Sequence, residues 1–317
     1  MKEEIESISH PTNRLIATKP LEDMKKKPEL ISPEEKEKLL KAQHEYYSKT
    51  YILFLLLQEL KNREFAILSS HMEKKHIAVR LLYSTNINYL QMNLKAFGVS
   101  SGKKLCNLYR GSSIFKPNTI PVSTYFLEKR LDEEKYQKFF KSYEENAISI
   151  DFIVDIDGET TEEAYKIAKE LYDLFMSLKI CFYIKNSGRR GFHLCVPYAF
   201  SPDIPITELI ELYKKVLKNL AEAYGFEKFI DTSTAKKQGL IKLSYSLDCG
   251  SGVPNVVLPL TSEMFENWKP EMCLMDNVLK NVKLLPNGKA RDLCLFRHNL
   301  SDEQLKENFK KFLKDFS

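Results

Sequence analysis

The sequence predicts an α+β fold in which an antiparallel sheet is packed with helices. Short β-branched segments alternate with amphipathic helical segments, and no long series of Val- and Ile-rich segments indicates a parallel sheet. The chain has 317 residues, of which 43% are hydrophobic and 29% are charged. This composition supplies a sizeable core and excludes a mostly disordered or fibrous protein.

The first part of the chain begins with a polar segment. Residues 1–31 mix Lys, Glu and Pro with little periodicity and are predicted to form a flexible tail. Order is expected to begin at Ser32, which opens a capping box and a long helix that runs to about residue 60. Strands are expected within residues 64–84, and a helix is expected over residues 86–97.

The middle of the chain has the clearest periodicity. Residues 149–156 alternate and are rich in β-branched side chains, so they are predicted to form one strand. A capped amphipathic helix is predicted over residues 160–178. The other predicted elements are strands over 180–184, 192–197, 240–247 and 255–260, a helix over 209–224 that ends at Gly225, and a helix over 301–316.

The order of these elements favours an RRM-like sheet. Residues 146–317 are predicted to form this RRM-like module, and residues 32–145 are predicted to form an N-terminal α/β module packed against it. Together they are expected to make one domain over residues 32–317, which is within the size range of a single folding unit.

Charge and cysteine content limit the possible classes of protein. The net charge of +5 is too small to establish a polyanionic partner, because it does not show whether the cations share one face. No two of the six cysteines make a Cys-x-x-Cys half-site, so reduced thiols and a cytoplasmic location are expected. The longest apolar run, residues 51–57, is too short to cross a bilayer, so no membrane partner is expected.

Two carboxylates stand at the end of the strand predicted over residues 149–156. Asp155 and Asp157 are next but one along an extended chain, so they point to the same side of the strand. Such a pair also occurs where a strand end reaches solvent. However, no Lys or Arg lies within residues 149–159 to neutralise the two charges, which favours a site for Mg²⁺ or Mn²⁺.

The turn between the next two predicted strands has a phosphate-binding composition. It offers a hydroxyl, two guanidinium groups and two glycines that permit a tight turn, and a histidine follows it. The residues are Ser187, Gly188, Arg189, Arg190, Gly191 and His193. A hairpin turn with solvated arginines is the alternative. The histidine and the Asp-x-Asp pair one helix earlier favour phosphate binding.

A third carboxylate, Asp231, follows the apolar residues Phe229 and Ile230. On its own, this residue is best explained as a helix cap or a turn residue. If the fold brings it to the edge that carries Asp155 and Asp157, the three acids complete a two-metal site of the polymerase type. In such a site, ions about 4 Å apart activate a 3′-hydroxyl and stabilise the leaving pyrophosphate.

Taken in order, these motifs resemble a known superfamily. The motifs are D-I-D at 155–157, S-G-R-R-G-F-H at 187–193 and I-D at 230–231, followed by L-I-K-L at 240–243. They are similar to motifs of the catalytic small subunit of archaeo-eukaryotic primases and of the wider primase-polymerase superfamily. Segments at 45–47, 63–66 and 105–112 resemble family segments in the same order, so the resemblance extends over most of the chain.

The resemblance implies a role for each matching residue. Asp155, Asp157 and Asp231 would hold two catalytic divalent ions, Mg²⁺ or Mn²⁺. The implied reaction is template-directed transfer of nucleotides from NTPs or dNTPs to a 3′-hydroxyl, with single-stranded DNA template and primer as partners. The residues implied to grip the nucleotide are Ser187, Gly188, Arg189, Arg190, His193, Lys242 and Ser246.

The sequence departs from the family pattern in two respects. Asp248 stands where the family has a histidine, and residues 250–252 lack a later lysine, so cationic contacts to a triphosphate are lost. Small subunits of cellular primases usually carry a Cys-rich zinc knob, often between the first two motifs. Here one helix alone separates Asp157 from Ser187, so this sequence is expected to lack the knob and to bind no zinc. The chain therefore resembles the compact primase-polymerases of mobile elements, plasmids and CRISPR loci more than a replicative primase subunit. Replication or CRISPR adaptation proteins are the implied protein partners.

Two other functions remain open at this point. A non-catalytic RRM-like nucleic-acid-binding protein stacks bases on aromatic side chains of its central strands, but residues 192–195 offer one aromatic ring alone. A two-metal nuclease or phosphatase could use the same aspartates with little recognition of a triphosphate. The sequence also leaves open whether ribo- or deoxynucleotides are preferred, and whether strands are started or only extended.

Overall fold

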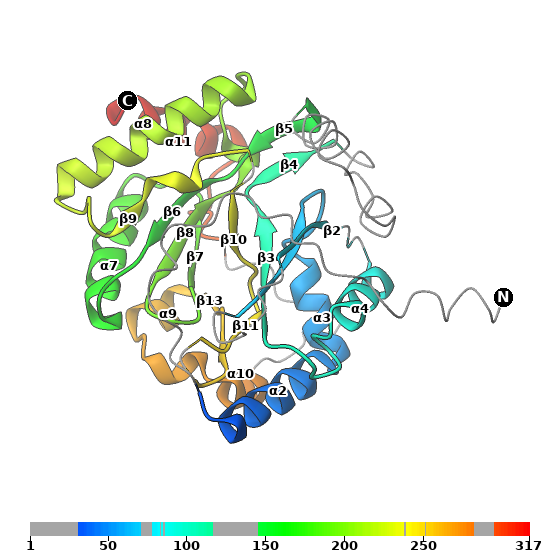
Figure 1. Cartoon of the computed structure of the whole chain (residues 1–317). Helices are drawn as coiled ribbons and strands as arrows, with labels where there is room; N and C mark the ends of the chain where they lie inside the picture. Colours follow the sequence, from blue (N-terminus) through cyan, green and yellow to red (C-terminus); the bar gives the residue numbers. More distant parts are fainter. Residues whose placement is uncertain are drawn as a thin grey trace.

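The computed structural model describes most of the chain outside its first thirty residues. The described part is a mixed α+β structure with antiparallel sheets, as the sequence predicts (Figure 1). The flexible tail predicted over residues 1–31 lies almost wholly outside the described residues. These are residues 31–70, 78–82, 84, 86–116, 145–237, 239–250, 252–281 and 295–317.

The chain enters the fold through two helices, where the sequence predicts one long helix. Helix α2 (Pro33–Tyr47) begins at the expected capping box, in which the Glu35 N–H donates to the Ser32 hydroxyl at 3.2 Å. Helix α3 (Thr50–Leu57) carries the apolar run and buries most of it. The single helix is broken because Lys49 between them takes an extended conformation.

A four-stranded antiparallel sheet forms beside these helices, in the order β10-β3-β1-β2. Helix α4 (Ile87–Ala96) follows β2, as predicted, and starts at the cap Asn86. Strand β10 comes from the second predicted module, so both predicted modules contribute to this sheet; the boundary between them stays a prediction. The strands are β1 (Phe65–Ser69), β2 (Ala78–Leu82), β3 (Cys106–Gly111) and β10 (Leu240–Lys242).

A five-stranded antiparallel sheet, in the order β13-β7-β8-β6-β9, holds most of the predicted site. Its first four strands along the chain and two helices follow the β-α-β-β-α-β connectivity of the split βαβ motif. Helix α8 ends at Gly225, whose φ of +70° is the left-handed conformation that closes helices, as predicted. The elements are β6 (Phe152–Ile156), α7 (Thr161–Ser177), β7 (Tyr183–Asn186), β8 (Phe192–Val196), α8 (Ile206–Tyr224), β9 (Ile230–Asp231) and β13 (Pro259–Leu260).

The single strand predicted over residues 149–156 is in fact two strands. Strand β5 (Ala147–Ile150) pairs with β4 (Ser113–Phe115), whereas β6 belongs to the five-stranded sheet. The break falls at Asp151, whose buried carboxylate lies 2.9 Å from a guanidinium nitrogen of both Arg63 and Arg110. Ile150 and Phe152 on either side of it both remain in the main core, so the side chains keep their alternation while the strand changes its pairing partner.

The strand predicted over residues 240–247 is also interrupted. Only β10 and the short β11 (Leu247–Asp248) are extended, and Tyr245 between them has a φ of +62°. Strand β12 (Asn255–Val256) pairs with β11. The short elements that complete this region are η3 (Tyr198–Phe200), η4 (Thr232–Thr234), α9 (Ser262–Glu266), η5 (Pro270–Cys273) and α10 (Met275–Asn281).

The two faces of the five-stranded sheet differ in their surroundings. Helices α7, α8 and α11 (Asp302–Asp315) lie on one face, where the Phe152 ring packs 5.0 Å from the Tyr213 ring and 5.6 Å from the Phe309 ring (Figure 1). On the other face, Ile153 and its neighbours pack against Ile241 of β10. The polar groups of that second face therefore lie toward the four-stranded sheet. None of the described helices has the length and apolar character that a membrane span requires.

Candidate active site

Four of the polar residues form one row across the five-stranded sheet. Asp155 pairs with His193 on one side and with Asp231 on the other, and His193 pairs in turn with Lys185. Directly opposed residues of antiparallel strands share a face, with their Cα atoms about 4.5–5.5 Å apart. The fold therefore brings Asp231, from 76 positions further along the chain, next to Asp155, as the sequence analysis required for a joint site.

Each carboxylate of the row already has a partner. Asp155 Oδ1 lies 3.1 Å from His193 Nε2. Asp231 caps η4, since its Oδ1 accepts the Ser233 N–H at 2.7 Å and its Oδ2 accepts the Ser233 hydroxyl at 3.0 Å. The cap explains why a helix-cap interpretation of Asp231 was reasonable from sequence, and it holds the side chain at the edge of the sheet.

Asp157 lies just beyond the end of β6 and is exposed. Its backbone N–H donates to the Phe229 carbonyl at 2.8 Å, which keeps the chain extended past the strand and directs this side chain to the face of Asp155. Gly191 of the turn approaches closely: a Cβ placed there would lie 2.7 Å from Asp157 Oδ1 and 3.1 Å from Ser187 Oγ. The turn and the carboxylate pair are therefore neighbours.

The turn from Ser187 to Gly191 is closed by its own polar groups. The Gly191 N–H donates to Ser187 Oγ at 3.1 Å, and the Ser187 N–H donates to the Gly191 carbonyl at 2.9 Å. Asn186 braces it from the preceding strand, because its side chain donates to the Gly191 carbonyl and accepts the Gly188 N–H at 2.7 Å. Gly188 has a φ of +81°, the left-handed conformation that favours glycine.

The two arginines of the turn are exposed. Arg190 Nη1 donates to the Glu159 carbonyl at 2.9 Å, which holds the guanidinium on the Asp157 side of the turn. The arrangement leaves both guanidinium groups at the surface, where a bound anion could meet them.

Lys242 and Ser246 have different surroundings. Lys242 Nζ forms an ion pair with Asp248 and donates to the Ser187 carbonyl at 3.0 Å, so it contacts the turn. Ser246 is buried and its hydroxyl donates to the Leu243 carbonyl at 2.6 Å. The structure thus brings Lys242 to the turn, whereas the Ser246 hydroxyl is hydrogen-bonded to the backbone.

His193 is a buried residue with one unsatisfied atom. Its side chain is 5% exposed, and its Nε2 faces Asp155. Its Nδ1 is buried without a hydrogen-bond partner in the described structure. An unsatisfied buried nitrogen costs free energy, and a water molecule or a ligand atom can relieve that cost.

The environment moves the pKa values of the two neighbouring aspartates in opposite directions. Burial raises the pKa of Asp155, but His193 and Lys242 outweigh this effect and bring it below its ordinary value. Burial and the charge of Asp155 raise the pKa of Asp157 above its ordinary value. Like charges therefore oppose each other at this edge, and a bound cation would relieve the repulsion.

The chemistry of the donor set fits a hard divalent cation. Three carboxylates on one sheet edge are the ligands that Mg²⁺ and Mn²⁺ prefer. Within the described residues, no group of three or more His, Cys, Asp or Glu side chains is already arranged to hold a metal ion. Asp155 and Asp231 keep acceptor sites for a metal ion beside their present contacts, since an ionised carboxylate has about four lone-pair sites.

Sequence reasoning missed a group of buried charges that begins at Lys185, at one end of the row. Lys185 Nζ lies 3.2 Å from Glu59 Oε2, and Glu59 Oε1 lies 3.2 Å from Arg110 Nε. Lys185 Nζ also donates to the Lys242 carbonyl at 2.7 Å. The available signal was a charged residue inside an apolar segment, because Lys185 follows Cys181 to Ile184 and Glu59 follows the run at 51–57.

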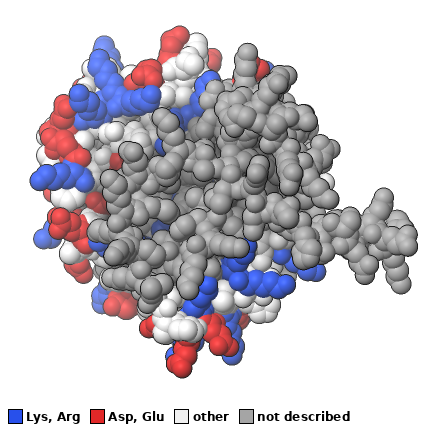
Figure 2. Space-filling model, viewed as in Figure 1, with Lys and Arg blue, Asp and Glu red and all other residues white. Residues whose placement is uncertain are grey.

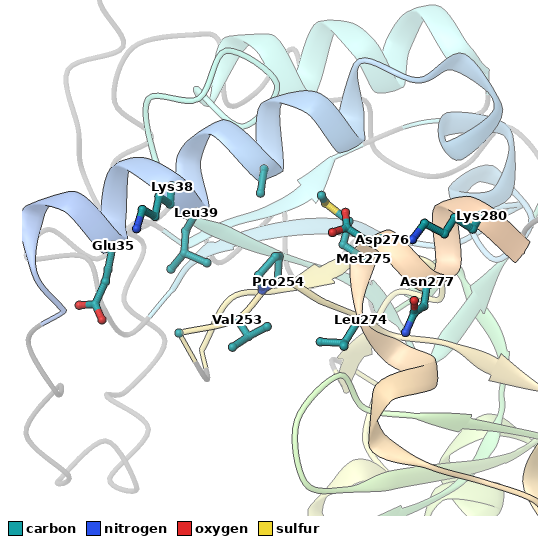
Figure 3. Close-up of a pocket in the computed structure, with 12 residues that line it drawn as sticks. Glu35, Lys38, Leu39, Val253, Pro254, Leu274, Met275, Asp276, Asn277 and Lys280 are labelled. Carbon is teal, nitrogen blue, oxygen red and sulfur yellow. The ribbon is translucent and has the colours of Figure 1, made fainter.

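A pocket of about 530 Å³ lies elsewhere, between α2 and α10. Lys38 comes from α2, and Asp276 and Lys280 come from α10. Val253 and Pro254 come from the loop between β11 and β12 (Figure 3). No predicted site residue lines this pocket. It is therefore separate from the aspartate row.

The described surface carries charges of both signs. Figure 2 shows the molecule from the same side as Figure 1, and on the described part of this face Lys and Arg side chains are interspersed with Asp and Glu. On the part that is visible, the small net charge does not result from one uniformly basic surface. The candidate for anion binding is thus the local turn.

Comparisons with known proteins add distant structural similarity. No protein-family model matches the sequence. No curated protein matches it either. Among solved structures, the polymerase domain of Mycobacterium tuberculosis Ligase D in complex with DNA is similar, with a TM-score of 0.49 and 14% identity over 79% of this chain and 92% of that chain. At this level of similarity the match bears on neither activity nor ligands, so a functional proposal has to rest on the site.

Proposed function

We propose that this protein is a primase-polymerase that adds nucleotides from NTPs or dNTPs to a 3′-hydroxyl on a single-stranded DNA template. The observation that supports the proposal most is the juxtaposition of three carboxylates with a glycine- and arginine-containing turn. Asp155 and Asp231 are cross-strand neighbours, and Asp157 Oδ1 lies beside Gly191 of the turn. An RRM-like catalytic sheet is part of the same proposal.

The carboxylates would act through two divalent ions, Mg²⁺ or Mn²⁺, which lower the pKa of the 3′-hydroxyl and offset negative charge on the leaving pyrophosphate. Asp155, Asp157 and Asp231 would hold these ions. The 3′-oxygen attacks the α-phosphorus, the bond from this phosphorus to the bridging oxygen breaks, and pyrophosphate leaves with the electron pair. The hydroxyl proton passes to solvent.

The turn would orient the triphosphate. Arg189 and Arg190 are exposed, and a planar guanidinium can donate two parallel hydrogen bonds to a phosphate. His193 is also assigned to the nucleotide in this proposal, and the Nε2 of this residue lies 3.1 Å from Asp155 Oδ1. A nuclease that used the same aspartates would not need such a set of phosphate-binding groups beside them.

Replacement of Asp157 tests the proposal. Asp157 is the suitable position because the residue reaches the surface, whereas replacement of Asp155 would remove the partner of the buried His193. Asp157→Asn is expected to slow extension of a primed template in Mn²⁺ by about 100-fold or more, because a metal ligand is lost. Its thermal unfolding temperature should be no lower than that of the wild type, because the change removes a like charge beside Asp155.

The matched control is Asp173→Asn, which removes one carboxylate from the exposed Lys169–Asp173 pair on α7. This variant should extend primers at the wild-type rate, and a chelator should stop both proteins. Wild-type extension by a folded Asp157→Asn variant would contradict the proposal. Shortening of the labelled strand by the wild type would instead indicate a nuclease. Separate reactions with rNTPs and dNTPs, with and without primer, establish the nucleotide preference and whether strands are started.

A further inference from the structure

Two lysines link the turn to the four-stranded sheet in a reciprocal manner. Lys185 Nζ donates to the carbonyl of Lys242 at 2.7 Å, and Lys242 Nζ donates to the carbonyl of Ser187 at 3.0 Å. The first bond fixes β10 against β7, and the second returns from β10 to the residue that opens the turn. The position of Ser187 therefore depends on both sheets.

Each lysine is neutralised by a buried acid. Lys185 faces Glu59, which is 3% exposed, and Lys242 faces Asp248, which is 2% exposed. Removing one member of a buried pair leaves the other charge without compensation, so these contacts are exchanged only at a high cost in free energy. The pairs favour fixed positions for both ammonium groups.

The donors of Lys242 are largely used by the protein itself. An ammonium group has three N–H donors, and in Lys242 one is directed to Ser187 and another to Asp248. At most one remains for a substrate. A phosphate could therefore receive one hydrogen bond from this lysine, and a second would require Lys242 to give up the contact that holds Ser187 or the contact with Asp248.

The turn also packs directly on Asp248. A Cβ placed on Gly188 would lie 2.9 Å from the Asp248 Cβ and 3.2 Å from Val257 Cγ2. Asp248 is held in turn by the Gly250 N–H, which donates to its Oδ1 at 2.7 Å. Asp248 thus supports the turn in two ways, by packing beneath Gly188 and by holding Lys242 toward Ser187.

We infer that Asp248 and Lys242 are positioning residues that hold the Ser187–Gly191 turn in place for an incoming triphosphate. The family resemblance implies that Lys242 binds the phosphates, and its contacts with Ser187 and Asp248 give it this supporting role in the turn. The triphosphate as ligand rests on the proposed function. The support of the turn rests on the contacts alone.

Asp248→Asn distinguishes a positioning role from simple masking of the Lys242 charge, because the two predict opposite changes in the KM for nucleotide. If Asp248 merely masks the charge of Lys242, the variant makes the site more positive, and the KM for nucleotide falls. If the pair positions the turn, the KM for nucleotide rises by about tenfold, which corresponds to about 1.4 kcal/mol and to the loss of one charged hydrogen bond. The KM for primed template should stay within about twofold of the wild-type value. General destabilisation would not change one KM and leave the other unchanged.

Hydrogen exchange gives a readout that does not depend on activity. In Asp248→Asn, backbone amides of residues 186–191 should exchange faster, while those of β6 and β8 keep wild-type protection. Unchanged exchange in the turn, or a lower KM for nucleotide, would overturn the inference. Asp173→Asn, with the same change in charge, should alter neither quantity.

A double variant covers the case in which Asp248→Asn fails to fold. Lys242→Met with Asp248→Asn removes both charges and leaves no uncompensated ion. The turn should still exchange faster, because the bond to Ser187 is lost, and wild-type protection would contradict the inference. If the wild-type protein extends no primer, the proposed function fails, while the exchange experiment still decides whether the pair positions the turn.

Discussion

Gly191 is the residue whose size controls how closely the turn approaches the carboxylates. A Cβ at this position would lie 2.4 Å from the Ile156 carbonyl oxygen and 2.7 Å from Asp157 Oδ1. The first neighbour cannot yield easily because it is backbone of a paired strand, and the second could yield only if a carboxylate of the candidate metal site moved. The absence of a side chain here is therefore a requirement of the site geometry.

Gly191→Ala is expected to displace the turn or the end of β6. The displacement should reduce the free energy of unfolding by about 1–3 kcal/mol, the usual range for overpacking. It should also weaken nucleotide binding, measured as a higher KM for nucleotide than that of the wild type. Gly252→Ala serves as a control, because Gly252 has a φ of +77° but open space around its Cβ position. That control should lose about 1–2 kcal/mol of stability through backbone strain, with unchanged nucleotide binding. Equal nucleotide binding by Gly191→Ala and the wild type would show that the close approach is not required.

The predicted residues differ in how far local sequence could place them. The sequence predicts that Asp155 and Asp157 lie on one side of a strand, because strand alternation is a local property. In the structure, Asp155 is paired with His193 and Asp231. Lys242 was identified by motif alone. Its ion pair with Asp248 and its bond to Ser187 depend on how β10 meets β7, and no local pattern encodes that meeting.

At the scale of elements, the end of helix α2 supports the segment that carries Asp248. The Tyr46 hydroxyl donates to the Tyr245 carbonyl at 2.8 Å, and the Tyr47 hydroxyl accepts the Leu247 N–H at 2.9 Å. Both tyrosine side chains are buried. Helix α2 is therefore connected to the turn through β11, although it contributes no residue to the site.

Tyr47→Phe tests this connection. The change leaves the buried Leu247 N–H without its acceptor, which should lower the free energy of unfolding by about 1–3 kcal/mol. Because Leu247 precedes Asp248, the variant should also raise the KM for nucleotide. In the control Tyr165→Phe, the lost hydroxyl bonds the Phe265 carbonyl at a partly exposed site, where water can replace it. Denaturant unfolding measures both variants. If Tyr47→Phe loses no more free energy of unfolding than Tyr165→Phe, the proposed connection is contradicted.

Elements with local signals were predicted well, and elements set by distant contacts were not. The last helix begins at the capping box of Ser301 and Gln304, and helix α7 begins at its expected cap, because both signals lie within four residues. By contrast, the strand over residues 149–156 is divided at Asp151, whose partners Arg63 and Arg110 lie far away in the sequence. Periodicity cannot reveal such a buried ion pair.

For the whole molecule, a buried charge cluster connects the two sheets. Glu59 follows α3, Arg110 lies on β3 and Lys185 lies on β7, so one carboxylate joins three parts of the fold. The Ser244 N–H also donates to Glu59 Oε2 at 2.6 Å. Loss of this carboxylate would leave buried positive charge between the sheets, and the effect should therefore be global.

Glu59→Gln is expected to destabilise the protein by about 3–5 kcal/mol at pH 7, as for other broken buried ion pairs. Burial raises the pKa of Glu59, but Lys185 and Arg110 outweigh it and hold the pKa far below its ordinary value. The stabilisation is thus fully present above the unfolded-state pKa of about 4.3 and is lost as the pH falls below it, because the unfolded state binds the proton first. The difference between wild type and variant should shrink from pH 5 to pH 3.

Urea unfolding monitored by the single tryptophan measures this difference. Trp268 packs 5.0 Å from the Phe192 ring and 5.5 Å from the Tyr165 ring, so its fluorescence reports the helix-covered face of the five-stranded sheet, away from Glu59. A loss of stability at this distant probe follows only if the charge cluster stabilises one cooperative unit. Glu307→Gln, in an exposed pair with Lys310, should differ little from wild type at any pH. A difference for Glu59→Gln that stays constant between pH 5 and pH 3 would contradict the assignment of an ionised, pKa-lowered carboxylate.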